Sequence, residues 1–282
     1  MTSLPLVPLP SSVTPSPGAF FALTADVAVT GDADATGVLH RLILTRTGLH
    51  ITADPGRAVI DVAVDGDGPP ESYRMSVDEH RVSIRGADAA GLFYGAQTLG
   101  QLIAGSPEGW VIPAVDIADE PRFAYRGVML DVARHFHDVS TVTAYLERAA
   151  SLKFNVLHLH LTDDQGWRLA LASRPELAAR ASSSAVGGDP GGFYTPDDYR
   201  AIIAHAAANH MTVVPEFDMP GHTHAVGLAY PEVAAAPSLE GWDAAGGPTP
   251  VAGEPYSGMG VGFSSLRIGA PATDAFVEDV LT

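Results

Sequence analysis

The alternation of apolar runs and helical segments in the second half of the chain restricts its fold more than any other feature of the sequence. Near-continuous apolar runs at 125–133, 156–163 and 212–218 predict strands, and the segments 140–152 and 196–210 between them predict helices. Apolar runs without polar alternation are typical of strands covered on both faces, as in a parallel sheet. This βαβαβ order predicts an α/β unit, built either as a barrel or as a doubly wound sheet. No glycine-rich phosphate loop opens either helix, which disfavours a nucleotide-binding sheet.

The residues before this unit predict a smaller domain of different architecture. Short β-type runs at 26–30 and 49–52 are followed by two alternating runs within 72–86, and residues 87–105 have helical spacing. The pattern predicts one sheet with one helix, preceded by a Pro/Ser-rich lead-in (1–18) without periodicity. A boundary is expected at the proline that follows Asp-Glu at 119 and 120. We therefore expect a small α+β domain over 1–120 and a larger α/β domain over 121–282.

Composition excludes several classes of partner. With 16 basic and 33 acidic residues the formal charge is −17, which repels nucleic acid and anionic lipid and suits a neutral substrate. The absence of cysteine excludes disulfides, a thiolate nucleophile and a cysteine-ligated zinc site. The first residues lack a basic n-region, and no apolar run approaches the roughly 20 residues that span a bilayer. We expect a cytoplasmic protein without a membrane segment, unless a secretion signal lies outside this start site.

Polar side chains gather where each of the three predicted strands ends. The first strand ends in DVARHFHD, which contains Arg134, the second in LTDDQGW and the third in PEFDMPGHTH. In a (β/α) barrel these ends share one rim, where such enzymes place their reacting groups. The clusters therefore predict one site at this rim.

Some of these side chains also have structural interpretations. Asp163 and Asp164 could cap the segment that follows them, and Asp131 could be a buried acid paired with Arg126. Trp167 could be a core side chain or a surface on which a sugar stacks. For these side chains a structural role and a role in the predicted site both stay open.

The histidine pairs in HLH (158–160) and HTH (222–224) have the spacing of metal ligands on an extended strand. Strand alternation puts His158, His160 and Asp164 on one face and Asp163 on the other, so His158 and Asp163 should not bind one ion. A sugar site has other requirements, which Arg134 meets as a forked donor for hydroxyls and Asp163 with His222 as a carboxylate–imidazole dyad. A metal-dependent barrel hydrolase stays as an alternative.

Four long segments resemble the first half of the catalytic barrel of glycoside hydrolase family 20, the β-N-acetylhexosaminidases. They are YRGVMLDVARHF, FNVLHLHLTDDQGWRL, GGFYTPDDYRAIIAHAAANH and VVPEFDMPGHTHA, and RGADAAGLFYGAQTLGQL resembles the helix of the family's small N-terminal domain. The resemblance implies an α/β fold, an incomplete (β/α)8 TIM barrel of about three βα units preceded by a small α+β domain.

The resemblance also implies an activity. The family removes terminal, non-reducing GlcNAc or GalNAc from glycans and chitooligosaccharides with retention, and the substrate's own acetamido oxygen is the nucleophile. It implies no cofactor and no metal. By the motifs, Arg134 resembles the arginine that binds sugar hydroxyls, Asp163 and His222 resemble the dyad that supports the general acid, and Asp218 resembles an acid at the rim. The histidines at 158 and 160 are then packing or supporting residues.

One part of the family's machinery has no counterpart in this sequence. The resemblance implies an Asp-Glu pair at the end of the fourth strand, but the only Asp-Glu dipeptides, at 78–79 and 119–120, precede the predicted barrel. The last residues, ATDAFVEDVLT, resemble the third barrel helix. We therefore expect residues 1–282 alone not to hydrolyse glycosides, and a non-catalytic carbohydrate-binding or partner-dependent chain is a further alternative.

Overall fold

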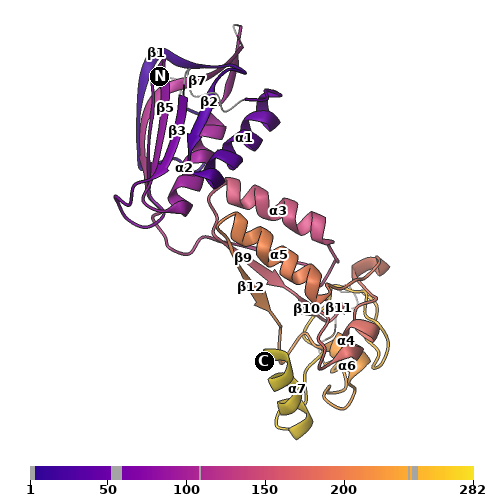
Figure 1. Ribbon diagram of the computed structural model, residues 1–282. Coiled ribbons are helices and arrows are strands. Elements are labelled where there is room, and N and C mark those ends of the chain that lie inside the picture. The colour runs from indigo at the N-terminus through magenta and orange to yellow at the C-terminus, as the bar shows by residue number, and fades with distance from the viewer. Residues whose placement is uncertain (1–3, 52–58, 108, 241, 243–246) are drawn as a thin grey trace. The chain divides into compact units, whose positions relative to one another are not determined.

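The protein consists of two compact units (Figure 1). The structure, a computed structural model, describes residues 4–51, 59–107, 109–240, 242 and 247–282. The first unit contains the residues up to 126 together with 149–153, and the second contains 127–148 and 154–282. No helix among the described residues is both long and apolar enough to cross a bilayer.

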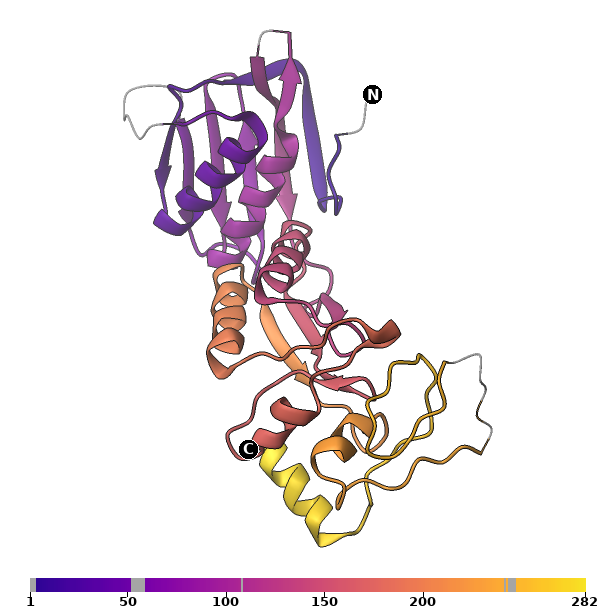
Figure 2. The ribbon, with the colours of Figure 1, turned by 90° about the vertical axis from the view of Figure 1, so that its right-hand side faces the viewer.

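The first unit is a sheet with two helices on one face, as Figure 2 shows from a second side. Its strands run in the order β1-β7-β4-β5-β3-β2, and β6 pairs with β7. The elements are β1 (Ser12–Leu23), β2 (Ala28–Gly31), α1 (Ala33–Thr47), β3 (Val59–Val64), β4 (Tyr73–Val77), β5 (Arg81–Gly86), α2 (Ala89–Leu102), β6 (Ala104–Ser106) and β7 (Gly109–Asp119). Buried aliphatic side chains from the sheet and from α2, such as Ile60, Ile84 and Leu99, form its core.

Two features of this unit differ from the sequence prediction. The sheet carries two helices: α2, which was predicted, and α1, which lies in a region where only short β runs were expected. Of the run predicted at 49–52, residues 49–51 are not in a strand, and residue 52 lies outside the described residues. The Pro/Ser-rich lead-in, for which no strand was predicted, contains the start of β1, which pairs with β7 along the edge of the sheet. Edge strands tolerate proline, and the register shifts between Pro15 and Phe20.

The second unit is built on a parallel sheet of order β12-β9-β8. Its elements are β8 (Gly127–Asp131), α3 (Val139–Ser151, of which 149–151 belong to the first unit), β9 (Val156–His160), β10 (Thr162–Asp163), β11 (Gly166–Trp167), α4 (Pro175–Arg180), η1 (Val186–Gly188), α5 (Pro196–Ala208), β12 (Thr212–Glu216), α6 (His224–Ala229) and α7 (Pro271–Leu281). The three strands and the two helices between them confirm the predicted βαβαβ order. A contact of 3.0 Å between His205 of α5 and Glu147 of α3 joins the two helices side by side.

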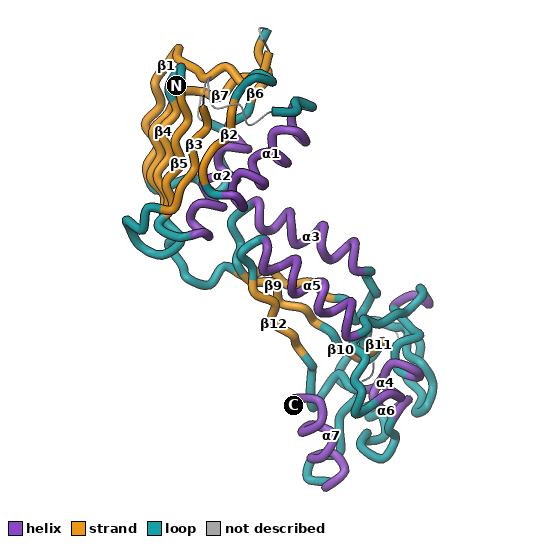
Figure 3. Tube along the Cα trace, in the orientation of Figure 1, coloured by secondary structure: helices purple, strands orange, loops and turns teal. Residues whose placement is uncertain are grey.

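Beyond the strand ends the chain is mostly loop, shown in teal in Figure 3. The short hairpin of β10 and β11 follows β9, and α4, α6 and α7 lie around it. Trp167 is 1% exposed, stacks on Phe217 and donates its indole N–H to the carbonyl of Leu169 at 2.6 Å. It is therefore a core side chain and not a surface on which a sugar stacks.

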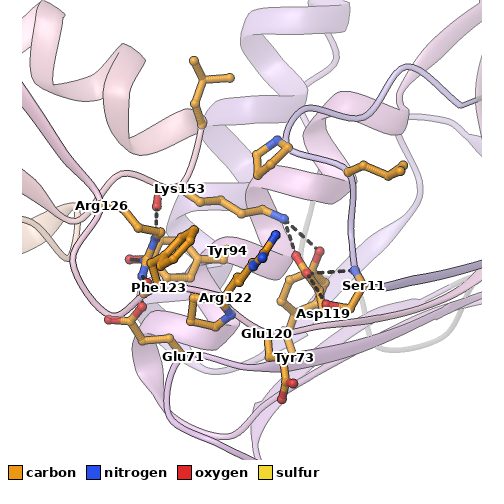
Figure 4. Close-up of a pocket in the computed structure, with 14 residues that line it drawn as sticks. Ser11, Glu71, Tyr73, Tyr94, Asp119, Glu120, Arg122, Phe123, Arg126 and Lys153 are labelled. Atoms are coloured by element: carbon orange, nitrogen blue, oxygen red, sulfur yellow. Dashed lines mark hydrogen bonds and ion pairs between the residues drawn. The ribbon is translucent and has the colours of Figure 1, made fainter.

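A cavity of about 360 Å³ lies in the first unit (Figure 4). Among its lining residues, Lys153 extends toward Asp119 and Tyr73, with Nζ at 2.7 Å from the carboxylate and 3.1 Å from the phenol oxygen. Arg126 donates to the Tyr94 hydroxyl at 3.0 Å and pairs with Glu71 at 2.7 Å. The contacts of Lys153 hold it to Tyr73 of β4 and Asp119 of β7 in the sheet of this unit.

Candidate active site

The carboxyl ends of β8, β9 and β12 meet in one row. The parallel register places His160 opposite Asp131 on one side and opposite Glu216 on the other. Side chains at the ends of three neighbouring strands therefore meet at one edge, as expected for a barrel rim.

Asp163 lies at the centre of this cluster with its side chain fully buried. Its Oδ2 lies 2.7 Å from an Arg134 guanidinium nitrogen and 2.8 Å from His160 Nε2. Its Oδ1 accepts the N–H of Asp164 at 2.6 Å and lies 3.0 Å from His222 Nδ1. Burial acts to raise the pKa of Asp163, but these hydrogen bonds and the adjacent positive charges outweigh burial and lower it. Asp163 is therefore an ionised carboxylate held by donors from four other residues.

Arg134 is positioned by the turn that follows β8. Asp131 Oδ1 accepts the backbone N–H groups of Ala133 and Arg134, both at 2.9 Å, and Asp131 Oδ2 accepts from the Arg134 guanidinium at 2.9 Å. The partner of Asp131 is thus Arg134, and the predicted pairing with Arg126 is wrong because Arg126 belongs to the network of the first unit. The Arg134 side chain stays 29% exposed, so its guanidinium can still reach a ligand.

His222 and Asp218 complete the set of predicted site residues. His222 adopts φ 56°, a left-handed conformation that is uncommon for residues other than glycine, and its ring lies against Asp163 with 31% of the side chain exposed. The N–H of Asp218 donates to the Thr162 hydroxyl at 2.9 Å. A carboxylate oxygen of Asp218 lies within 4.8 Å of ligand atoms of both Asp163 and His222. All four residues predicted from the sequence therefore gather at one place.

The strand-alternation argument fails for His160. It places His160 and Asp163 on opposite faces, but β9 ends at His160 and the chain turns into the β10–β11 hairpin. His160 therefore contacts Asp163 directly, and its Nδ1 lies 3.1 Å from Glu216. His160 belongs to the centre of the cluster.

Asp164 has a different role from capping the segment that follows it. Its Oδ1 accepts the N–H of His224 at 3.0 Å and the hydroxyl of Ser264, which is 100 residues away in the chain. Burial, with a smaller contribution from the Asp163 charge, raises the pKa of Asp164 above the ordinary value of an aspartate. The two adjacent aspartates therefore have opposite electrostatic environments, and no sequence signal identified Ser264 as part of the site.

Among the residues that the structure describes, two groups of side chains have ligand atoms close enough for a metal ion: His160, Glu216 and Asp218, and Asp163, Asp218 and His222. In both groups the ligand atoms at the centre already have partners in hydrogen bonds or ion pairs. Arg134 supplies a positive charge 2.7 Å from Asp163, and both ring nitrogens of His160 face carboxylates. An ion would have to displace these bonds, so the arrangement favours a site that works through hydrogen bonds.

A buried, ionised carboxylate bonded to an arginine and a histidine at the carboxyl ends of parallel strands is the arrangement expected at the rim of a (β/α)-barrel enzyme. Residues 123–282 match the catalytic domain of glycosyl hydrolase family 20, and residues 3–120 match domain 2 of the same family. The chain belongs to glycoside hydrolase family 20.

Individual relatives agree with this assignment. The beta-N-acetylhexosaminidase of Cellulomonas fimi is 40% identical over 294 residues, which cover 100% of this chain and 57% of that protein. A solved family 20 beta-N-acetylglucosaminidase has a TM-score of 0.89 at 58% identity and covers 97% of this chain and 55% of its own. A mutant Streptomyces plicatus beta-hexosaminidase in complex with its product GlcNAc has a TM-score of 0.84 at 38% identity and covers 98% of this chain and 55% of its own. The chain thus spans little more than half the length of these relatives, and its resemblance to β-N-acetylhexosaminidases is confirmed.

Proposed function

We propose that the strand-end cluster forms part of a β-N-acetylhexosaminidase site that removes terminal, non-reducing GlcNAc or GalNAc with retention. The observation that carries the proposal is the convergence of Arg134, Asp163 and His222 from three strand ends, with Asp163 bonded to both of the others at 2.7 and 3.0 Å. Structures of relatives from Streptomyces plicatus and Vibrio harveyi contain GlcNAc, which supports an N-acetylhexosamine as the sugar.

Each residue has a distinct part in the proposed reaction. Arg134 is partly exposed and binds sugar hydroxyls through its guanidinium fork. Asp163 holds His222 at Nδ1, and the imidazole then supports the general acid through its other nitrogen. Asp218 lies at the rim of the same network. The acetamido oxygen of the substrate acts as the nucleophile, so no second carboxylate nucleophile is required.

The general acid itself is expected beyond the third strand, in an Asp-Glu pair. No Asp-Glu dipeptide follows residue 120 in this sequence. We therefore predict that residues 1–282 alone release no p-nitrophenol from p-nitrophenyl N-acetyl-β-D-glucosaminide. The same residues joined to the part of the Cellulomonas fimi relative that follows the matched region, hereafter the extended polypeptide, are expected to release it. Turnover by residues 1–282 alone, or inactivity of a folded extended polypeptide, would contradict the proposal.

A second prediction concerns Arg134. In the extended polypeptide, Arg134→Lys is expected to lower kcat/KM about 10- to 100-fold, because a single ammonium cannot keep the contacts to Asp131 and Asp163 and also bind hydroxyls. The matched control is Arg200→Lys, on the 71% exposed arginine of α5. If kcat/KM falls in Arg134→Lys while the melting temperature stays unchanged, the result supports sugar binding by Arg134. If both fall equally, Arg134 has a structural role only.

Stoichiometric zinc in the protein, with activity lost on adding a chelator, would instead support the metal-dependent alternative.

A further inference from the structure

Glu216 reaches the centre of the cluster through the sheet register. It is paired with His160 in the parallel ladder between β12 and β9, where neighbouring strands lie about 4.8 Å apart. Its Oε1 lies 3.1 Å from His160 Nδ1, and its Oε2 lies 2.7 Å from His158 Nε2. Glu216 therefore lies against two histidines of one strand, and one of these, His160, is bonded to Asp163.

The other nitrogen of His160 has two neighbours with opposite requirements. Nε2 lies 2.8 Å from Asp163 Oδ2, a carboxylate oxygen that needs an N–H from the ring. It also lies 2.9 Å from a guanidinium nitrogen of Arg134, a donor that needs a lone pair on the ring. The ring is 5% exposed, so water does not replace either partner. The protonation of His160 therefore decides whether Asp163 or Arg134 is satisfied at Nε2.

The charges around the ring favour protonation of both nitrogens. The groups that face it are Asp131 and Arg134 from β8 and the following turn, Asp163 from β10, and Glu216 and Asp218 from β12 and the following loop. Burial acts to lower the pKa of His160, but the bonds to Asp163 and Glu216 and the charge of Asp131 outweigh burial and raise it. With an N–H on Nε2, Asp163 Oδ2 accepts from both His160 and Arg134, and Oδ1 remains for His222.

We propose that Glu216 is a positioning residue: through the His160 ring it keeps an N–H on Asp163 Oδ2 and so holds Asp163 with Oδ1 facing His222. The effect of Glu216 on turnover rests on the proposed function of the Asp163–His222 dyad. The protonation of His160 does not, and it can be measured on its own.

The direct test is ¹⁵N NMR of the histidine rings in the chain of residues 1–282. In the wild type, both ring nitrogens of His160 are expected to carry protons at pH 7, where an unperturbed histidine of pKa about 6.5 is mostly neutral. In Glu216→Gln the shape of the side chain is kept and its charge is lost. The titration midpoint of His160 should then fall by about one pH unit or more. The control His158→Gln removes the other contact of Glu216 and should leave this midpoint unchanged.

The outcomes separate this proposal from the proposed function. A wild-type His160 that is neutral at pH 7, or equal shifts in Glu216→Gln and His158→Gln, would refute the positioning role. The wild-type spectrum needs no variant, so the protonation of His160, on which the positioning role depends, can be tested even if Glu216→Gln fails to fold. In the extended polypeptide, Glu216→Gln should lower kcat about 10- to 100-fold with little change in KM. An unchanged kcat would show that His160 does not act on the dyad, whereas an inactive wild-type extended polypeptide would count against the proposed function alone.

Discussion

Replacing Asp163 by asparagine is expected to destabilise the second unit by about 3–5 kcal/mol at neutral pH. This is the cost of removing one partner from a buried ion pair while the other partners stay in place. The carboxylate accepts from Arg134, His160, His222 and the Asp164 N–H, whereas an asparagine amide presents an NH2 group to some of these donors. Hydrogen exchange of the peptides around β9 and β10, compared between wild type and Asp163→Asn, measures the loss.

The pH dependence of this difference has a defined sign. The pKa of Asp163 is lowered below its ordinary value of 3.8 in the folded protein, so its stabilisation is complete above the unfolded-state pKa and is lost as the pH falls through the folded-state pKa. The part of the difference between wild type and Asp163→Asn that comes from the ionisation of Asp163 should therefore be fully present above about pH 4 and shrink below it. The control is Asp189→Asn, on an aspartate that is 66% exposed and 3.3 Å from His135, which should change stability by less than about 1 kcal/mol. If Asp163→Asn destabilised the protein by less than about 1 kcal/mol, as expected for the exposed control, the cluster would not hold Asp163 as an ion.

The part of the site that follows from local patterns was predictable from the sequence. Apolar runs located β8, β9 and β12, and the rule that parallel strands end at one rim brought Arg134, Asp163 and His222 together. The roles of these residues in catalysis stay predictions. The helix α1 also had signals in the sequence that were missed, because Asp32 caps its first turn and Gly48 ends it with φ 74°.

Contacts that depend on register or on distant loops were not predictable in this way. The pairing of Glu216 with His160 is set by how two strands align, which neither strand encodes alone. The contact of His160 with Asp163 exists because β9 stops three residues earlier than its apolar run indicates, and the hairpin pairing of Thr162 with Trp167 then redirects the chain. The bond from Ser264 to Asp164 joins residues 100 positions apart, beyond the reach of any periodicity argument.

The second large effect is expected in the first unit, where Lys153 and Asp119 form a buried ion pair. Their side chains are 8% and 12% exposed, and Nζ lies 2.7 Å from the carboxylate. Burial lowers the pKa of Lys153, and the Asp119 carboxylate opposes that change, so the charge of Lys153 depends on Asp119. Lys153→Met keeps most of the side-chain volume but leaves Asp119 with hydrogen bonds from Ser11 and no buried cation at this position. The expected loss is about 3–5 kcal/mol.

Two comparisons isolate this effect from a general loss of packing. Arg74→Met removes two ion pairs at 2.7 Å from a side chain that is 49% exposed, and it should cost less than about 1 kcal/mol. The double change Lys153→Met with Asp119→Asn should recover part of the loss, because no unpaired charge then stays buried. Hydrogen exchange of the β4 and β7 peptides is the measurement, and equal protection in Lys153→Met and wild type would contradict the role of this pair. A polypeptide that ends at residue 120 lacks this cation and also Arg126, which contacts Tyr94 and Glu71, so it should lose at least as much protection as Lys153→Met. The sheet of the first unit is therefore expected to depend on a side chain that lies within the sequence of the catalytic domain.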